Sequence, residues 1–139
     1  MNSYSESEYE IFSRSFILRE YSEENIRKLS NLNVGIVGIG GIGCPLIEYL
    51  IRSGIKKLTL IDGDVVEKSN LNRQILFDHN NLGEKKVRVA KNKLKLINPE
   101  TNINIIETNL DNDNLSTLSN CTIIVDAADD WKVSRLLNK

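Results

Sequence analysis

The sequence predicts an α/β fold in which a mostly parallel β-sheet carries helices on both faces. Short runs of β-branched and apolar residues alternate with longer segments whose apolar residues recur at helical spacing. The first run opens into closely spaced glycines, and the second ends in an aspartate. Parallel strands need crossover connections, which are right-handed in nearly all proteins, so we expect the strand order 3-2-1-4.

The expected elements divide the chain into two parts. Residues 1–30 are expected to form a mobile N-terminal arm followed by a helix, and residues 31–139 are expected to form the α/β domain. The strands are predicted at residues 34–37, 57–61, 102–108 and 121–125. The helical segments are predicted at residues 22–30, 43–53, 70–76, 84–97 and 112–118, with a last helix from residue 131.

The side-chain pattern of each segment supports these assignments. The first strand is rich in β-branched residues, namely Val34, Ile36 and Val37. The helix that follows carries an apolar stripe made of Leu46, Ile47, Leu50 and Ile51. The helix at 84–97 carries a similar stripe, made of Val87, Ala90, Leu94 and Ile97. The fourth strand opens at Cys121 and is apolar.

The glycines between the first strand and the first crossover helix read G-x-G-G-x-G. Gly38 permits a tight turn, Gly40 lets the backbone approach a phosphate, and Gly43 lets the helix lie close to the strand. Gly41 adds a second flexible position. The pattern predicts a phosphate site at the start of the helix, although glycine-rich turns also occur as plain connectors.

The second strand ends in Asp62, the position at which an acidic residue binds ribose hydroxyls in Rossmann-like nucleotide sites. The alternative interpretation is a turn former beside Gly63. An NAD-binding Rossmann domain of an oxidoreductase would satisfy the pattern up to this point.

The segment after Asp62 favours ATP over NAD. Asn70 and Arg73 lie one helical turn apart, and the Arg73 guanidinium suits the non-bridging oxygens of a triphosphate. Lys86 falls in the first turn of the next long helix, beside this segment. The alternative interpretation is that Arg73 caps a helix or pairs with Asp64 or Glu67.

The ordered motifs resemble the ATP-dependent adenylating family that includes ThiF, MoeB, the ubiquitin-activating enzymes and peptide-adenylating relatives of the microcin-C type. The resemblance runs from about Phe12 to the last residue. Its pieces are Ser13-Arg14, the glycine loop 38–43, Asp62-x-Asp64, Ser69-Asn70-Leu71-x-Arg73-Gln74, Lys86, Asn98-Pro99 and Asp126-Ala127-Ala128-Asp129.

The resemblance implies an adenylyltransferase that uses ATP and Mg²⁺ to activate a carboxylate as an acyl-adenylate, with release of pyrophosphate. The carboxylate would be the C terminus of a ubiquitin-like protein, a sulfur-carrier protein or a peptide. The implied catalytic residues are Arg73, Lys86 and Asp129. The implied nucleotide-binding residues are Gly38, Gly40, Gly41, Gly43, Asp62 on the ribose, Asp64, Asn70, Arg73, Gln74 and Lys86. Arg14 is implied to reach the ATP of a neighbouring subunit.

The sequence departs from the family pattern in two places. The arm often reads R-Y-x-R-Q in the family, and here only its second arginine, Arg14, is present. The family often reads D-N-x-x-x-R after the fourth strand. An ungapped match puts Asp129 at the aspartate but Ser134 at the arginine, whereas Arg135 fits only if Asp130 takes the aspartate position. We expect Asp129 to bind Mg²⁺, with Asp130 as the alternative.

Composition and charge argue against nucleic-acid binding, a membrane location and a zinc site. The net charge is −1 and no basic block is present, so no nucleic-acid partner is expected. No long apolar run or signal-like start is found, so we expect a cytoplasmic protein without a membrane partner. Cys44 and Cys121 form no C-x-x-C pair, so no zinc site is expected, and Cys44 is interpreted as a packing residue.

The sequence stops where complete members of the family continue into a second half. We therefore expect the fourth strand to lie at an exposed edge and the chain to associate, as a homodimer in the simplest case. The missing half would cover the adenylate, so this chain is not expected to adenylate efficiently alone. A catalytically incomplete interaction module is the remaining alternative.

Overall fold

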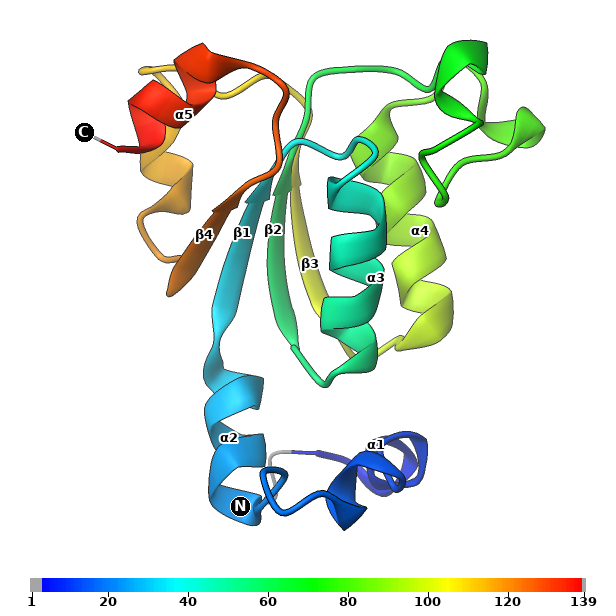
Figure 1. Ribbon diagram of the computed structural model, residues 1–139, viewed down its shortest axis with the longest axis vertical. Helices are drawn as coiled ribbons and strands as arrows, with labels where there is room; N and C mark the ends of the chain where they lie inside the picture. The colour runs from blue at the N-terminus through cyan, green and yellow to red at the C-terminus, as the bar shows by residue number, and fades with distance from the viewer. Residues whose placement is uncertain (1–3, 139) are drawn as a thin grey trace.

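The computed structural model describes residues 4–138 and contains one four-stranded sheet (Figure 1). All pairings are parallel, and the strand order is β3-β2-β1-β4, which confirms the predicted order 3-2-1-4. The strands are β1 (Asn33–Val37), β2 (Lys57–Ile61), β3 (Asn102–Ile106) and β4 (Ile123–Asp126).

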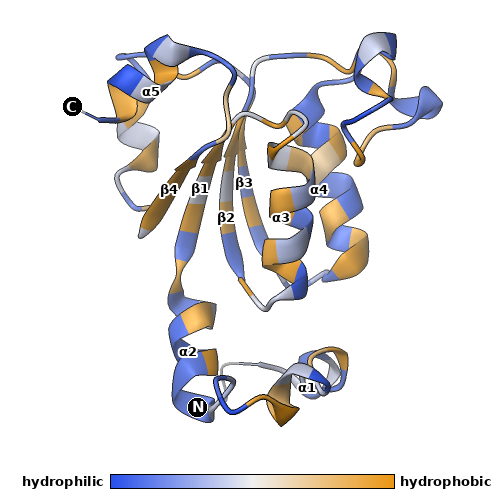
Figure 2. Ribbon diagram, in the orientation of Figure 1, coloured by the Kyte–Doolittle hydropathy of each residue, from blue (hydrophilic) through white to orange (hydrophobic). Residues whose placement is uncertain are grey.

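Helical elements cover both faces of the sheet, as predicted. Helices α3 (Gly43–Arg52) and α4 (Lys86–Ile97) lie side by side against one face (Figure 1). The 3₁₀ turn η4 (Leu115–Leu118) and helix α5 (Trp131–Leu137) lie against the other. Figure 2 shows that α3 and α4 carry hydrophobic and hydrophilic stripes, as expected for helices that bury one side.

Alternating residues of β1 feed two separate cores. Val34 and Ile36 pack into the larger cluster beneath α3 and α4. Val37 packs with Leu118 and Leu136 in the smaller cluster under η4 and α5. A strand that is buried on both faces reads as a continuous apolar run, which is the pattern seen in its sequence.

The register of the sheet brings several chain segments to one edge. Val37 is paired with Ile61 of β2 and with Asp126 of β4, and Ile61 is paired with Ile106 of β3. Because parallel strands point in the same direction, the loops that follow them emerge together at the carboxyl edge. Ligands bind at this edge in open α/β sheets.

Residues 4–31 pack beneath the opposite, amino edge of the sheet (Figure 1). They form α1 (Glu6–Ile11), the 3₁₀ turn η1 (Ser15–Ile17) and α2 (Glu23–Asn31). The Tyr4 hydroxyl donates to the carbonyl of Gly54 at 2.6 Å, and buried Glu8 contacts Lys56 and Asn98. The structure therefore differs from the predicted mobile arm for the residues that it describes from Tyr4 onward.

Two predicted helical segments are shorter than expected. In place of a helix at 70–76 the structure has turns, which lie between the 3₁₀ turns η2 (Lys68–Asn70) and η3 (His79–Asn81). In place of 112–118 it has the 3₁₀ turn η4. Asparagine and aspartate side chains hydrogen-bond the local backbone here, as Asn114 does to the N–H of Asp111. Such bonds compete with helix formation.

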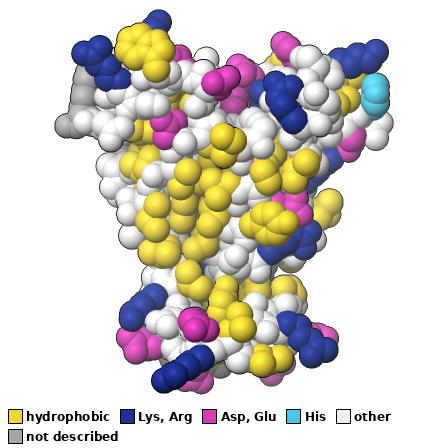
Figure 3. All heavy atoms as spheres, viewed as in Figure 1, with side chains coloured by type: hydrophobic (Ala, Val, Ile, Leu, Met, Phe, Trp, Pro, Cys, Tyr) yellow, Lys and Arg dark blue, Asp and Glu magenta, His cyan; other side chains and the backbone are white. Residues whose placement is uncertain are grey.

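Strand β4 lies at an edge of the sheet, as predicted. Ile123 and Ile124 are both nearly half exposed, and Trp131 of α5 is largely exposed. Figure 3 shows hydrophobic side chains gathered on the face of the molecule over β1 and β4. Within residues 4–138, no helix combines the length and hydrophobicity needed to cross a lipid bilayer.

Candidate nucleotide site

A cavity of about 730 Å³ opens at the carboxyl edge of the sheet, where the loops after the strands meet. It lies at the point between β1 and β4 where the strand order reverses. The structure brings together at this cavity the sequence-predicted residues Gly38, Gly40, Gly41, Asp62, Asp64, Asn70, Arg73, Gln74, Lys86, Asp129 and Asp130. Gly43 and Arg14 are the two predicted site residues that do not line it.

Two glycines are required by the path of the backbone. Gly38 has a φ of +96°, and a Cβ there would lie 2.7 Å from the carbonyl oxygen of Ala127. A Cβ on Gly43 would lie 2.1 Å from the carbonyl oxygen of Gly38. Gly43 therefore allows the start of α3 to lie close to the turn that follows β1, as predicted for the last glycine of the motif.

The other two glycines are open on the cavity side. A Cβ on Gly40 would have the Gln74 side chain as its nearest neighbour at 3.7 Å, and a Cβ on Gly41 would meet the Arg73 side chain at 3.6 Å. Both distances are ordinary van der Waals contacts. Packing does not require glycine at these positions, so the missing side chains keep the cavity open and leave room for a ligand.

Asp62 is oriented by the backbone around it. Its Oδ2 accepts from the N–H of Ile39 at 2.7 Å, and its Oδ1 accepts from the N–H of Asp64 at 2.8 Å. The carboxylate is buried at the cavity wall and links β2 to the glycine loop. A carboxylate in this place can also accept from hydroxyl groups of a ligand, since each oxygen has two lone pairs.

The loop after β2 carries two buried amides to the cavity. Asn70 is buried, and its Oδ1 accepts from the N–H of Glu67 at 2.9 Å. Gln74 is 4% exposed, and among the described residues no donor reaches its Oε1. A buried amide oxygen without a partner is costly, so this position suits a ligand or water that donates a hydrogen bond.

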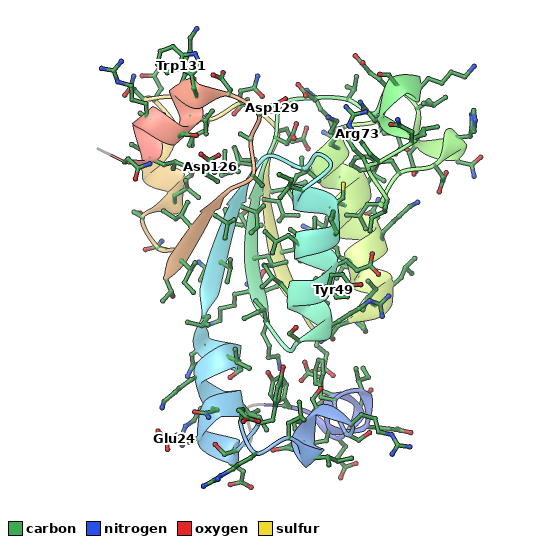
Figure 4. The ribbon with its side chains drawn as sticks, in the orientation of Figure 1. Glu24, Tyr49, Arg73, Asp126, Asp129 and Trp131 are labelled. Atoms are coloured by element: carbon green, nitrogen blue, oxygen red, sulfur yellow. The ribbon has the colours of Figure 1, made fainter. Side chains whose placement is uncertain are left out.

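Arg73 lies on the same loop and faces Asp129 across the carboxyl edge (Figure 4). Its Nη1 donates to the carbonyl of Ser69 at 2.9 Å and to Asn72 Oδ1 at 3.0 Å. The contact with the Ser69 carbonyl is of the capping kind that the sequence analysis gave as the alternative interpretation of Arg73. Within residues 4–138 no carboxylate pairs with Arg73, and Asp64 pairs instead with Lys86. The exposed guanidinium keeps N–H groups for an anionic ligand.

Lys86 begins α4 and is the buried cation of the cavity. Its Nζ lies 3.3 Å from Asp64 Oδ2, and the exposed side-chain fraction is 7% for Lys86 and 64% for Asp64. The Lys86 backbone N–H also donates to the carbonyl of Asp64 at 3.1 Å. The start of α4 is thus attached to the loop after β2 at two points.

The carboxylates of Asp129 and Asp130 differ in their hydrogen bonds within the protein. Asp130 caps α5, with its Oδ1 accepting from the N–H of Lys132 at 2.8 Å. Within residues 4–138 no hydrogen bond engages the exposed Asp129 carboxylate. No group of three or more histidine, cysteine or acidic side chains in this part of the chain is arranged to hold a metal ion. A Mg²⁺ ion is usually held by one or two carboxylates together with substrate phosphates, so a single aspartate is compatible with it.

Eight residues that line the cavity are not among the predicted site residues: Val37, Ile42, Ile61, Asn109, Leu110, Ala127, Ala128 and Val133. Asn109 Oδ1 accepts from the N–H of Gly63 at 3.1 Å, which fixes the loop after β3 against the loop after β2. Asn109 follows a predicted strand, so its place at the carboxyl edge could have been found. Its pairing with Gly63 is a long-range contact with no local signal.

Two further residues from the sequence analysis, Arg14 and Cys44, do not line the cavity. Arg14 lies between α1 and η1, in the N-terminal segment at the opposite end of the sheet (Figure 1). Cys44 is completely buried, and burial raises the pKa of its thiol to about 11. An inert thiol of this kind supports the interpretation of Cys44 as a packing residue.

Comparison with known proteins gives consistent relatives. The molybdopterin-synthase adenylyltransferase of Salmonella typhimurium is 36% identical over 91% of this chain and 51% of its own length. The crystal structure of E. coli TcdA, a tRNA N6-threonylcarbamoyladenosine dehydratase, in complex with ATP superposes with a TM-score of 0.84. It is 31% identical over 91% of this chain and 52% of that chain. E. coli MccB with AMPCPP and MccA also has a TM-score of 0.84 and 31% identity, over 99% of this chain and 42% of that chain.

These matches cover nearly all of this chain but only part of each relative. This chain spans between 34% and 51% of the length of three of its curated relatives. A family model described as the ThiF family matches residues 12–139, which is nearly the whole of this chain. This chain therefore belongs to the ThiF family.

Proposed function

We propose that this chain is the ATP-binding part of an adenylyltransferase that activates a carboxylate as an acyl-adenylate. The observation that carries the proposal is the cavity that the glycine loop, Asp62, Arg73, Lys86 and Asp129 line together. Two relatives add support: the Salmonella protein is named an adenylyltransferase, and the E. coli TcdA structure contains ATP. A nucleotide with several phosphates fits this cavity, because the cations Arg73 and Lys86 line it together with Asp62, the residue expected to bind the ribose.

The ribose is proposed to bind at Asp62. This carboxylate is held by two backbone N–H groups and retains lone pairs toward the cavity. The phosphates are proposed to lie over the glycine loop, near the start of α3, where unpaired N–H groups and the helix dipole favour anions. Gly40 and Gly41 leave the space that a phosphate would need.

Arg73 and Lys86 are proposed as the phosphate-binding cations. Each has N–H donors beyond those used in its recorded contacts, and both line the cavity. Asn70 and Gln74 supply amide groups on the same wall. Loss of one well-placed charge stabiliser in such a site costs on the order of 3 kcal/mol in the reaction barrier.

Asp129 is proposed as the Mg²⁺ ligand from the protein. It lines the cavity, and within residues 4–138 no hydrogen bond engages its carboxylate, whereas Asp130 caps α5. When bound, Mg²⁺ would neutralise phosphate charge and make pyrophosphate a better leaving group.

The reaction needs alignment and charge neutralisation more than proton transfer. A carboxylate is already ionised at neutral pH. One of its oxygens would bond to the α-phosphorus of ATP while the bond from that phosphorus to the leaving oxygen breaks. Pyrophosphate would depart with the bonding electron pair. The step therefore requires no general base.

The carboxylate is proposed to be the C terminus of a ubiquitin-like protein, a sulfur-carrier protein or a peptide. Support comes from relatives that are named for such partners, including a sulfur carrier protein adenylyltransferase of Thermus thermophilus. Two copies of the chain are further proposed to associate, with Arg14 of one copy approaching the nucleotide of the other. The exposed apolar surface around β4 is consistent with association.

The first test is binding of ATP with Mg²⁺, measured by titration calorimetry and by the shift in melting temperature. The chain should bind ATP with Mg²⁺ and should not bind NAD. Lys86→Gln should weaken ATP binding, and Lys91→Gln, the same change on the same helix outside the cavity lining, should not. Stabilisation by NAD without stabilisation by ATP would refute the proposal.

A second measurement separates an enzyme from an inert module. Exchange of labelled pyrophosphate into ATP should depend on an added carrier protein or peptide with a free C terminus. ATP binding without exchange in any longer form of the protein would favour a catalytically inactive interaction module.

A further inference from the structure

The cavity holds more carboxylates than cations. Asp62, Asp64, Asp129 and Asp130 line it together with only Arg73 and Lys86. A polyanionic ligand that enters this space meets an excess of negative charge. The carboxylate that contacts a cation then has a direct effect on how strongly that cation binds phosphate.

Asp64 is the carboxylate that makes such a contact. The Lys86–Asp64 pair is the one ion pair that joins two cavity residues within the part of the chain that the structure describes. Asp62 is occupied by two backbone N–H groups and Asp130 by the cap of α5. Asp64 is therefore the carboxylate that neutralises the buried Lys86 side chain.

The position of Asp64 is set by its neighbours. Its N–H donates to Asp62 Oδ1, and its carbonyl accepts from the N–H of Lys86. Its carboxylate is nevertheless 64% exposed, while the Lys86 side chain is 7% exposed. The lysine is thus held in the wall of the cavity, and the aspartate can turn into solvent when another anion takes its place.

Lys86 can serve only a limited number of anions. An ammonium group has three N–H donors, and within residues 4–138 Asp64 accepts from one of them. A buried ammonium without an anion would be strongly disfavoured, so Lys86 needs Asp64 whenever no ligand is bound. A bound phosphate would take over part of this role. The net binding free energy of the phosphate would be smaller, because the phosphate displaces the contact between Asp64 and Lys86.

We propose that Asp64 is the internal counter-ion of Lys86, and that Asp64 stabilises the ligand-free protein and lowers the affinity of the cavity for phosphate groups. The proposal rests on the proposed function in that it assigns Lys86 to phosphates. Its consequence for the reaction is that Asp64 competes with pyrophosphate for Lys86 and so promotes release of this product.

The test is a double-mutant cycle on the whole chain with Asp64→Asn, Lys86→Gln and the combined variant. Melting temperatures without ligand report the contribution of the ion pair to the stability of the ligand-free protein. Calorimetric titrations with ATP and Mg²⁺, and with inorganic pyrophosphate and Mg²⁺, report its effect on ligands. Asp78→Asn is the matched control, because Asp78 pairs with Lys93 and does not line the cavity.

The Asp64→Asn variant should melt at a lower temperature and bind both ligands about fivefold more tightly, the most that a pair with one exposed partner is expected to contribute. This gain should disappear when Lys86 is already glutamine. The Asp78→Asn control should leave both affinities unchanged within twofold.

Three results would overturn the inference. Weaker binding by Asp64→Asn would mean that Asp64 supports the ligand. A gain that persists in the Lys86→Gln background would mean simple charge repulsion without action through Lys86. Additive changes in melting temperature would mean that the ion pair contributes nothing to the stability of the ligand-free protein. Failure of the unmodified chain to bind ATP would instead count against the proposed function, and the melting temperatures would still test the ion pair.

Discussion

The N–H of Ile39 donates to Asp62 Oδ2 at 2.7 Å, so the carboxylate at the end of β2 holds the glycine loop that follows β1. The other oxygen accepts from the N–H of Asp64 at 2.8 Å. One buried side chain therefore joins two loops of the cavity wall. A residue proposed to bind the ribose also has a structural role that can be measured without a nucleotide.

Asp62→Asn should separate these two roles. The amide has one acceptor oxygen, so one of the two N–H groups loses its partner, and stability without ligand should fall by about 1 to 3 kcal/mol. The unmodified chain should bind ATP more tightly than 2′,3′-dideoxy-ATP, and the variant should lose much of this preference. Chemical denaturation and calorimetry measure the two effects. If Asp62→Asn keeps the full preference for ATP over 2′,3′-dideoxy-ATP, the proposal that Asp62 binds the ribose is wrong.

The glycine loop allows a matched comparison of two identical substitutions. Gly43→Ala should destabilise the fold by about 3 kcal/mol, because its Cβ would lie 2.1 Å from the Gly38 carbonyl oxygen. Gly41→Ala should leave the melting temperature close to that of the unmodified chain, because its Cβ has no neighbour closer than 3.6 Å. The new methyl group faces the cavity and should weaken ATP binding.

Thermal unfolding and calorimetry on the two variants decide the outcome. Equal loss of stability in both would show that Gly41 is also needed for folding. Unchanged ATP affinity in Gly41→Ala would show that phosphates do not pass close to this part of the loop.

Arg73→Ala should weaken binding of ATP with Mg²⁺ by about 1.5 to 3 kcal/mol, the range expected for a hydrogen bond to a charged group. Its recorded contacts are with the carbonyl of Ser69 and with Asn72, and the side chain is exposed, so the fold should be retained. Circular dichroism checks the fold and calorimetry checks the affinity. If Arg73 only caps the loop, stability will fall slightly and ATP affinity will not change.

The sequence was most informative where function depends on local backbone geometry. Gly38 and Asp62 directly follow β-branched strands, and parallel pairing then brings them to one edge whatever the details of packing. The strand order followed from the handedness of crossovers. The ends of short helical segments were less accurate, since Asn114 and its neighbours bind the local backbone in ways that periodicity does not reveal.

Long-range contacts account for what was missed. Asn109 reaches Gly63 across 46 positions, and Glu8 reaches Asn98 across 90. The acidic, polar character of the first residues predicted a mobile arm. In the structure Tyr4 and Phe12 are buried and Glu8 is paired, so the local composition was overruled by partners that lie far along the chain.

Glu8 provides a pH-dependent test of the packing of the N-terminal segment. Burial alone raises the pKa of this carboxyl, but hydrogen bonds from Lys56, Ser5 and Asn98 outweigh burial and bring the pKa below its usual 4.5. Since the pKa is lowered in the folded state, the contribution of Glu8 is complete above pH 4.5 and is lost as the pH falls toward the lowered pKa.

Glu8→Gln should therefore destabilise the chain by about 1 to 3 kcal/mol at pH 7, and the difference from the unmodified chain should shrink as the pH drops below 4.5. Glu10→Gln removes an exposed carboxylate from the same helix and serves as the control, with little expected change at either pH. Denaturant titrations at pH 7 and pH 4 measure both variants. A constant difference between Glu8→Gln and the unmodified chain across this range would show that the Glu8 charge is not what holds α1 against Lys56 and Asn98.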